Sequence, residues 1–312
     1  MKRFLGVFAL ATAVIGTNIS EATELFRDAL ESSVGWGVNS TGDTSATFGF
    51  DYSVSNLSIP EAPNTQVGDA STTGLLAQAN IVSPAAGESF IAYPIGESFS
   101  GSYQLRFDAW INFDADNFYN NGAAGTTEFI GGGLGYNDTD NNVGSGAQII
   151  ATGEGGSGSD WRAFADGAFL STGEMVAGTR NGFDPYYSDF LPSVSPPAGQ
   201  AQTAPGDSIA GSPGFQWVTF EVNTANGKSA VFIEKPGGDR LHITTINRDG
   251  SRPYTSDGNI GLFYADFFSS VSSAPQMQFG LFDNVVVTQI PEPMTASLIL
   301  VGLGLVAGCR RR

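Results

Sequence analysis

The sequence predicts an all-β protein built as a two-sheet antiparallel sandwich. Glycine is abundant, with 41 of 312 residues, and phenylalanine supplies another 23. In the central part, no window longer than about ten residues places apolar side chains at helical spacing. Short runs in which apolar and polar residues alternate occur instead, separated by Gly, Asn, Asp and Ser. This pattern is typical of strands with one face in a core and the other toward solvent.

Residues Met1–Ala22 have the three parts of a secretory signal peptide. Lys2 and Arg3 form a positively charged start, an apolar segment follows, and small residues stand at −3 and −1 of a cleavage site after Ala22. An N-terminal membrane anchor is the alternative, but the apolar segment is short for one. We expect an N-terminal signal helix, export through the Sec machinery and removal of this segment.

The next stretches carry the sandwich. Residues 23–33 place four apolar side chains on one helical face and predict a short helix. The clearest strand is at 102–113, where Trp110 falls on the polar side of the alternation. Further strands are expected at 46–54, 75–82, 88–95, 127–136, 146–152, 160–165, 214–223, 228–234, 240–247, 259–264 and 277–288. About a dozen short strands at near-regular spacing favour a sandwich or jelly roll.

Residues 192–213 interrupt the strand pattern. This stretch is rich in Pro, Ala, Gly and Ser and carries little apolar bulk, which predicts an exposed loop or a hinge between two halves. With both ends removed, one domain from Thr23 to Ile290 remains, and it is long enough for a substantial core.

Charge and cysteine content restrict the partners of this domain. Residues 23–290 hold nine basic and twenty-nine acidic residues, a net charge of −20. Nucleic acid and anionic lipid are poor partners, because binding them requires a basic footprint. Cations and neutral polysaccharides remain possible partners. Cys309 is the only cysteine, which excludes disulfides, thiolate metal sites and thiol catalysis in the domain.

The last 22 residues combine three features in a fixed order. They are the triplet Pro291, Glu292 and Pro293, an uncharged run over 294–309, and the basic cluster Arg310, Arg311 and Arg312. Sixteen helical residues span only ~24 Å, short of the ~30 Å hydrocarbon layer. The basic end is the one that a membrane holds on its cytoplasmic side. The run therefore predicts a marginal or temporary C-terminal transmembrane helix.

In this order the three features resemble the PEP-CTERM sorting tail of exported bacterial proteins. The resemblance implies that an exosortase-type membrane enzyme recognises the tail and cuts near the triplet. It also implies delivery to the cell envelope or an extracellular matrix, with transient or permanent anchoring at the C-terminus. An ordinary C-terminal anchor is the alternative.

A second resemblance concerns the domain itself. The strand at 215–222, the segment at 261–271 and the closing Phe-Gly-Leu-Phe-Asp-Asn-Val-Val-Val at 279–287 resemble the second half of concanavalin A-like, laminin-G-type sandwiches. The resemblance implies a jelly roll whose last strand returns beside the N-terminal strands and closes a sheet. These motifs are mostly core patterning, so they bear on fold more than on function.

The sequence offers no catalytic constellation. His242 is the only histidine and is expected on the surface. A laminarinase-like enzyme of this fold would carry Glu-x-Asp-x-x-Glu on one strand, and no such spacing occurs. We therefore assign no catalytic residue and expect a protein that is not an enzyme.

Two oxygen-rich loops are candidate Ca²⁺ sites. Asp114, Asp116 and Asn117 follow the clearest strand, and Asp138 and Asp140 lie in a second loop. Ca²⁺ takes six to eight oxygen ligands, which alternating side chains of a loop can supply. The alternative is that these residues only form turns, where Asp and Asn are common.

Four aromatic residues are candidate platforms for sugar rings: Trp110, Trp161, Tyr186 and Tyr187. The alternative is that each packs against the second sheet or a covering loop. The sequence thus indicates an exported envelope or matrix protein whose sandwich is structural or binds polysaccharide. A secreted glycan hydrolase on the same scaffold and a surface protein without a ligand are the competing interpretations.

Overall fold

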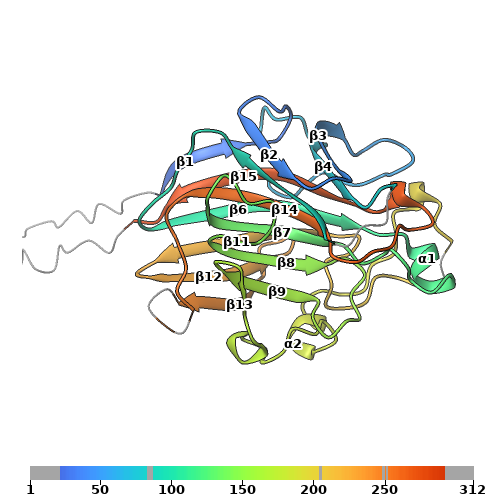
Figure 1. The fold of residues 1–312 in the computed structure, drawn as a ribbon. Helices are drawn as coiled ribbons and strands as arrows, with labels where there is room; N and C mark the ends of the chain where they lie inside the picture. Colours follow the sequence, from blue (N-terminus) through green and yellow to red (C-terminus); the bar gives the residue numbers. More distant parts are fainter. Residues whose placement is uncertain (1–21, 83–86, 204–205, 248–249, 251, 292–312) are drawn as a thin grey trace, which may run out of the picture. The chain divides into compact units, whose positions relative to one another are not determined.

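The computed structural model describes residues 22–82, 87–203, 206–247, 250 and 252–291. In this part the chain forms two antiparallel sheets packed face to face, which confirms the predicted class (Figure 1). Thr23–Ile290 is one unit. The signal peptide and the C-terminal run lie outside the described residues, and no described helix is long and apolar enough to span a membrane.

Sheet A has eight strands. Their order is β13 (Arg240–Asn247), β12 (Lys228–Glu234), β11 (Trp217–Ala225), β6 (Tyr103–Asn112), β15 (Phe279–Gln289), β4 (Thr73–Ala79) and β3 (Thr44–Asp51), and β1 (Thr23–Asp28) also pairs with β15. The last strand therefore lies between β6 and the N-terminal strands, as the second resemblance implies.

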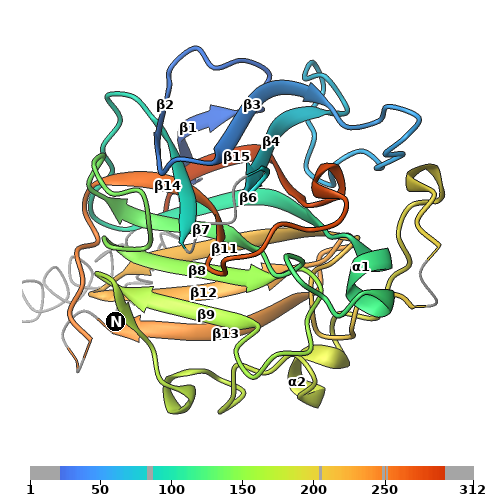
Figure 2. The same cartoon turned by 45° about the vertical axis from the view of Figure 1, so that its right-hand side comes forward.

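Sheet B has seven strands. Their order is β10 (Ala168–Phe169), β9 (Trp161–Ala165), β8 (Ala147–Thr152), β7 (Phe129–Tyr136), β14 (Asn259–Asp266), β5 (Glu88–Pro94) and β2 (Trp36–Ser40). Two short α-helices, α1 (Ala115–Asn120) and α2 (Pro185–Ser188), lie in the connections between strands (Figure 2).

The helix expected at 23–33 is wrong. The segment forms β1, which pairs with β15 from Thr23↔Gln289 to Asp28↔Val285. Phe26 packs against the core while Leu25 is 42% exposed. A free strand edge offers backbone partners to a short segment whose own helical tendency is weak, so the pairing decides its conformation.

The core between the sheets follows the predicted alternation. Leu105, Phe107, Ala109 and Ile111 of β6 are buried and face sheet B. Phe107 stacks on Phe220 of β11 with ring centroids 5.3 Å apart. Fully burying one such side chain contributes about 2 kcal/mol, so the β6–β11 pair is a major part of the core.

The stretch 192–213 is a covering loop fastened to the domain. Gln200 is buried and its Nε2 donates to Asn112 Oδ1 at 2.7 Å. Ser212 Oγ donates to the Gly153 carbonyl at 2.8 Å. The described residues of this stretch are thus bonded to the end of β6 in sheet A and to the residue after β8 in sheet B.

Candidate functional site

A groove with a volume of about 660 Å³ opens on the outer face of sheet A. Its floor is aromatic: Trp110 of β6, Trp217 of β11 and Phe215, which precedes β11. Its walls contain four prolines, Pro60, Pro63, Pro197 and Pro236. Residues far apart in the sequence thus meet because β6 and β11 are adjacent and two loops fold over their ends.

The two tryptophans are held edge to face. They are directly opposite in the β6–β11 register, with ring centroids 5.8 Å apart and planes at 62°. Trp217 Nε1 donates to the Pro60 carbonyl at 2.8 Å, which ties the 52–64 loop to the sheet. Each indole is only 3% exposed, so the floor presents ring edges rather than open faces.

Polar groups stand at the rim of the groove. Ser58 and Glu61 are exposed, and Gln216 is half-buried. Gln216 Nε2 donates to the Pro192 and Ser212 carbonyls at 3.1 and 3.2 Å. Glu61 is the only carboxylate among the described lining residues. The groove therefore combines an apolar interior with a few oriented hydrogen-bonding groups.

A buried polar network under the same loop fixes its position. Asp108 of β6 accepts from Asn64 N (3.0 Å), Asn64 Nδ2 (2.6 Å), Thr219 Oγ1 (2.6 Å) and Asn284 Nδ2 (2.9 Å). Burial raises the pKa of Asp108, and these hydrogen bonds oppose the shift. Asn64 thus attaches the 52–64 loop to Asp108 of sheet A, and Asn284 of β15 donates to the same carboxylate.

Asp283 performs a similar task beside Asp108. Tyr52 donates its hydroxyl to Asp283 Oδ2 at 2.8 Å, and the Tyr52 ring packs on Trp217 at 5.4 Å. Burial raises the pKa of Asp283 to about 8, with the Asp108 charge adding to the shift. The first residue of the 52–64 loop is thus bound to the last strand of the sheet.

The four aromatic residues expected to be sugar platforms lie in different environments. Trp110 lines the groove but is only 3% exposed, so it offers no open ring face, and Trp161 and Tyr187 are fully buried and stack on each other at 5.7 Å. Their assignment as platforms is corrected, because a ring without exposed surface offers no face to a ligand. Tyr186 is half-buried and its hydroxyl donates to the His242 carbonyl at 2.7 Å.

The sequence did not identify Trp217 as a site residue. The available signal was its alternation: Trp217 and Trp110 both fall on the polar side of their strands. Two large aromatic residues on the outer face of neighbouring strands require a cover or a ligand. The proline-rich stretches around Pro60 and Pro197 provide the cover.

The first candidate Ca²⁺ loop does not fit a metal site. Asp114 caps α1 by accepting from Asn117 N at 3.0 Å, and its other oxygen accepts from Ser273 Oγ and Ala274 N, both at 2.9 Å. Asp116 accepts from Thr203 N at 2.8 Å. Both oxygens of Asp114 and one oxygen of Asp116 are therefore used by protein donors, which leaves this loop too few free oxygens for the six to eight ligands of Ca²⁺.

The second loop is separate from the first. Asp140 Oδ2 accepts from Asn137 Nδ2 at 3.0 Å, and Asp138 adopts a left-handed backbone conformation at φ 61°. This loop follows β7 whereas α1 precedes it, so the two loops lie at opposite ends of an eight-residue strand. Across the described parts of the chain, no three His, Cys, Asp or Glu side chains converge on a metal-sized space.

Two glutamates approach each other away from the groove. Glu128 and Glu154 are 3% and 2% exposed, and each has one side-chain oxygen without a hydrogen-bond partner. Burial raises the pKa of Glu154 to about 8 and that of Glu128 well above its usual value, and the Glu154 charge adds to the shift of Glu128. Their burial keeps a polymeric substrate away from both carboxyls.

His242 belongs to no nucleophilic arrangement among the described residues. Its ring is half-buried and stacks on Phe232 at 4.7 Å, and Nε2 lies 3.0 Å from the Thr244 carbonyl and 2.9 Å from Thr245 Oγ1. A Ser-His-Asp triad requires a serine on one ring nitrogen and a carboxylate on the other, and neither partner is present.

Comparison with known proteins gives fold-level likenesses only. No family model matches the chain, and no curated protein matches it significantly. The chain is similar to the exoplasmic/lumenal domain of VIP36 in its Ca²⁺/Man3GlcNAc-bound form, at 7% identity and a TM-score of 0.43, over 85% of this chain and 88% of that one.

Two plant proteins give similar values. Metal-free lectin I-B4 from Griffonia simplicifolia is 9% identical with a TM-score of 0.43, over 85% of this chain and 100% of that one. Arcelin-5, a lectin-like defense protein from Phaseolus vulgaris, is 7% identical with a TM-score of 0.37, over 80% of this chain and 100% of that one. Scores this low assign no site, and the two-sheet architecture rests on this chain's own strand order.

Proposed function

We propose that this chain is an exported saccharide-binding protein of the cell envelope or extracellular matrix, sorted by its C-terminal tail. The observation that carries the binding function is the groove on sheet A. The signal peptide and the PEP-CTERM-like tail support the location. The protein acts by binding rather than by catalysis.

The chemistry of the groove suits a neutral sugar chain. Sugar rings have apolar C–H faces that pack against proline and aromatic surfaces, while their hydroxyls need donors and acceptors at the rim. Glu61, Ser58 and Gln216 supply those groups. Ligand sites commonly combine an apolar lining with a few placed polar groups in ~300–1,000 Å³, and this groove falls within that range.

The carboxylates argue against hydrolysis. A glycosidase needs two carboxyl groups about 5–10 Å apart on either side of the scissile bond. Among the described lining residues, Glu61 stands alone. Glu128 and Glu154 are close to each other but fully enclosed. The net charge of −20 in residues 23–290 also disfavours nucleic acid as the polymer.

Glu61→Gln tests the groove. We expect the purified protein to bind neutral oligosaccharides on a glycan array, and the variant to bind about tenfold more weakly, because a neutral amide oxygen replaces a charged acceptor, which forms the stronger hydrogen bond. Glu24→Gln, which changes an exposed carboxylate on β1, is the matched control. Equal binding by Glu61→Gln and wild type would remove the groove from the proposal.

The sorting function has its own test. Changing Pro291-Glu292-Pro293 to three alanines is expected to leave the full-length chain in the membrane fraction, because the processing enzyme no longer recognises its tail. Release at the wild-type rate would favour an ordinary anchor that is cut by another protease. Immunoblots of membrane and culture fractions distinguish the two.

A further inference from the structure

A second cavity, of about 350 Å³, lies on the outer face of sheet B. Arg162 and Phe164 of β9 point to this face, because Trp161, Ala163 and Ala165 between them are in the core. Phe169 of β10 and Phe267, which follows β14, complete the aromatic lining, and the 142–144 backbone closes one side. Phe164 and Phe169 stack with centroids 5.1 Å apart.

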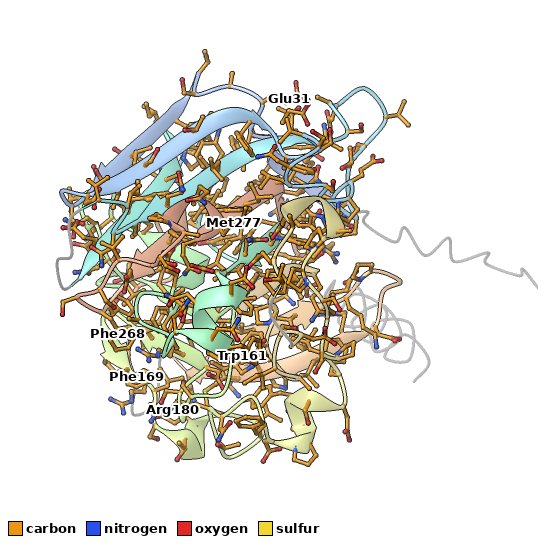
Figure 3. All side chains as sticks on the ribbon, turned by 90° about the vertical axis from the view of Figure 1, so that its right-hand side faces the viewer. Glu31, Trp161, Phe169, Arg180, Phe268 and Met277 are labelled. Atoms are coloured by element: carbon orange, nitrogen blue, oxygen red, sulfur yellow. The ribbon has the colours of Figure 1, made fainter. Side chains whose placement is uncertain are left out.

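Two guanidinium groups lie on these rings. Arg162 Cζ is 4.2 Å from the centroid of Phe129 and 5.9 Å from that of Phe267. Arg180 Cζ is 4.1 Å from the centroid of Phe169, and Figure 3 shows these two side chains close together. Cation–π contacts hold the Arg162 charge at the cavity and the Arg180 charge on Phe169, one of the residues that line it.

These two arginines differ from the other described ones. Arg27, Arg106, Arg240 and Arg252 each form an ion pair with a carboxylate. No described carboxylate lies within 4.0 Å of the guanidinium of Arg162 or Arg180. In a domain with three acidic residues for each basic one, leaving two neighbouring arginines without a carboxylate is unexpected.

Their hydrogen bonds are also incomplete. Arg162 Nε donates to the Ser159 carbonyl at 2.9 Å, and Arg180 Nη1 donates to the Leu170 carbonyl at 3.2 Å. Arg180 Nε is buried without a partner. Arg162 lines the cavity, and its guanidinium makes no further hydrogen bond to a described residue, so an anion in the cavity would supply an acceptor.

The two charges also act on each other. The pKa of Arg162 is lowered first by burial and then by the positive charge of Arg180, while Asp160 and Glu154 oppose the shift from farther away. Asp160 is occupied by Ser157 N and Gly182 N, at 2.9 and 2.8 Å. An anion at the cavity would therefore be attracted by both guanidinium groups.

We propose that this cavity binds the carboxylate-bearing ring of an acidic saccharide, a hexuronate unit, between Arg162 and the Phe164–Phe169 pair. The carboxylate pairs with the guanidinium groups, which match its planar geometry. The C–H groups of the sugar contact the exposed edge of Phe169, which is 38% exposed, because Phe164 and Arg180 already lie on its faces. The inference extends saccharide binding to a second site and does not require the groove on sheet A.

Size and net charge define the ligand further. A cavity of about 350 Å³ is at the lower end of the ~300–1,000 Å³ range of small-molecule sites, so it takes one ring rather than a chain segment. A net charge of −20 over residues 23–290 repels a polymer that is acidic at every residue. The ligand is therefore a mostly neutral polysaccharide with sparse hexuronate units.

Calorimetry with the purified full chain tests the assignment. The probes are a neutral xylo-oligosaccharide and the same oligosaccharide with one glucuronate branch. We expect the acidic probe to bind at least about tenfold more tightly, and Arg162→Gln to remove that difference. Lys228→Gln, which removes an exposed positive charge from β12, is the matched control and should leave it unchanged.

Further variants separate binding from folding. Phe169→Ala keeps the contact of Arg162 with Phe129 but removes the ring under Arg180, and it should weaken binding of the acidic probe severalfold, with thermal melts showing that each variant is folded. Glu61→Gln should not affect the preference for the acidic probe, so the two sites can fail independently. Equal affinity for both probes, an equal loss in Lys228→Gln, or binding to anionic lipid vesicles in place of the sugar would each overturn the proposal.

Discussion

The outer faces of the two sheets differ in how their arginine side chains are paired. On sheet A, Arg106 lies 3.2 Å from both Glu221 and Glu234, and Arg240 also pairs with Glu221. On sheet B, Arg162 and Arg180 lie on phenylalanine rings without a carboxylate partner among the described residues. On sheet A the arginines are neutralised by carboxylates of the same sheet, whereas on sheet B the two guanidinium charges are available to an anionic ligand.

The two faces also differ in how they are covered. The 52–64 loop lies over sheet A and is held by Tyr52, Asn64 and the Trp217 indole. It creates a second hydrophobic cluster there, around Trp110 and Trp217. On sheet B, the Phe169 ring remains partly exposed. Sheet B also has a buried cluster on its outer side, around Phe129 and Phe263, but Phe169 is not part of it, so Trp217 should contribute more to stability than Phe169.

Alanine substitutions of Trp217 and Phe169 test this difference between the sheets, and they should give the largest change in the free energy of unfolding. Trp217→Ala removes a buried indole and its hydrogen bond to Pro60, which should lower the free energy of unfolding by about 3–5 kcal/mol. Phe169→Ala should cost about 1 kcal/mol, because the ring is 38% exposed and loses one cation–π contact. Urea denaturation of both variants measures the difference. Similar losses would mean that both faces are equally structural.

The sequence predicted the inward faces of the strands but not the outward ones. The alternation at 102–113 matches β6 at Tyr103–Asn112, because one hydrophobic core imposes a two-residue period. Burial of Trp110 and Asp108 on the other face depends on a loop some fifty residues earlier in the chain, at 52–64. Local periodicity contains no information about such a cover.

The same limit explains the other errors. Trp161 was expected to be a platform because it is an aromatic residue with polar neighbours, yet it is the first inward residue of β9. The Arg162–Arg180 pair could not be found, because the two residues are brought together only by the chain returning along the edge of β9, where Trp161 N donates to the Arg180 carbonyl at 3.0 Å.

A change of pH should give an intermediate effect on both faces. Asp283 on sheet A and Glu154 near sheet B have pKa values raised by burial to about 8, and Asp266 to about 6. Unfolding returns each pKa to about 4, so the unfolded state binds fewer protons between about pH 4 and 8. Stability should therefore be greatest near pH 4–5 and fall as pH rises, by at most about 1.4 kcal/mol per pH unit for each group.

Neutral variants assign this dependence to a face. Asp283→Asn should remove the part of the pH dependence of the unfolding free energy that arises on sheet A. Glu154→Gln should remove the part that arises near sheet B. Urea denaturation at pH 5, 7 and 9 measures both. Self-repulsion of the acidic domain acts in the same direction, so the difference between variant and wild type is the informative quantity. A slope that neither variant changes would assign the effect to net charge alone.

Chelation should give the smallest effect, and it tests whether either face is supported by an ion. The oxygens of Asp114, Asp116 and Asp140 accept hydrogen bonds from protein donors, so we expect EDTA and Ca²⁺ to change the melting temperature by less than about 1 °C. An ion present at 100 times its Kd would instead stabilise the fold by about 2.7 kcal/mol.

Asp114→Asn separates the possibilities further. It should destabilise the fold equally with and without Ca²⁺, because the α1 cap and the bonds from Ser273 Oγ and Ala274 N do not involve a metal. A Ca²⁺-dependent loss in this variant would place an ion at the end of β6.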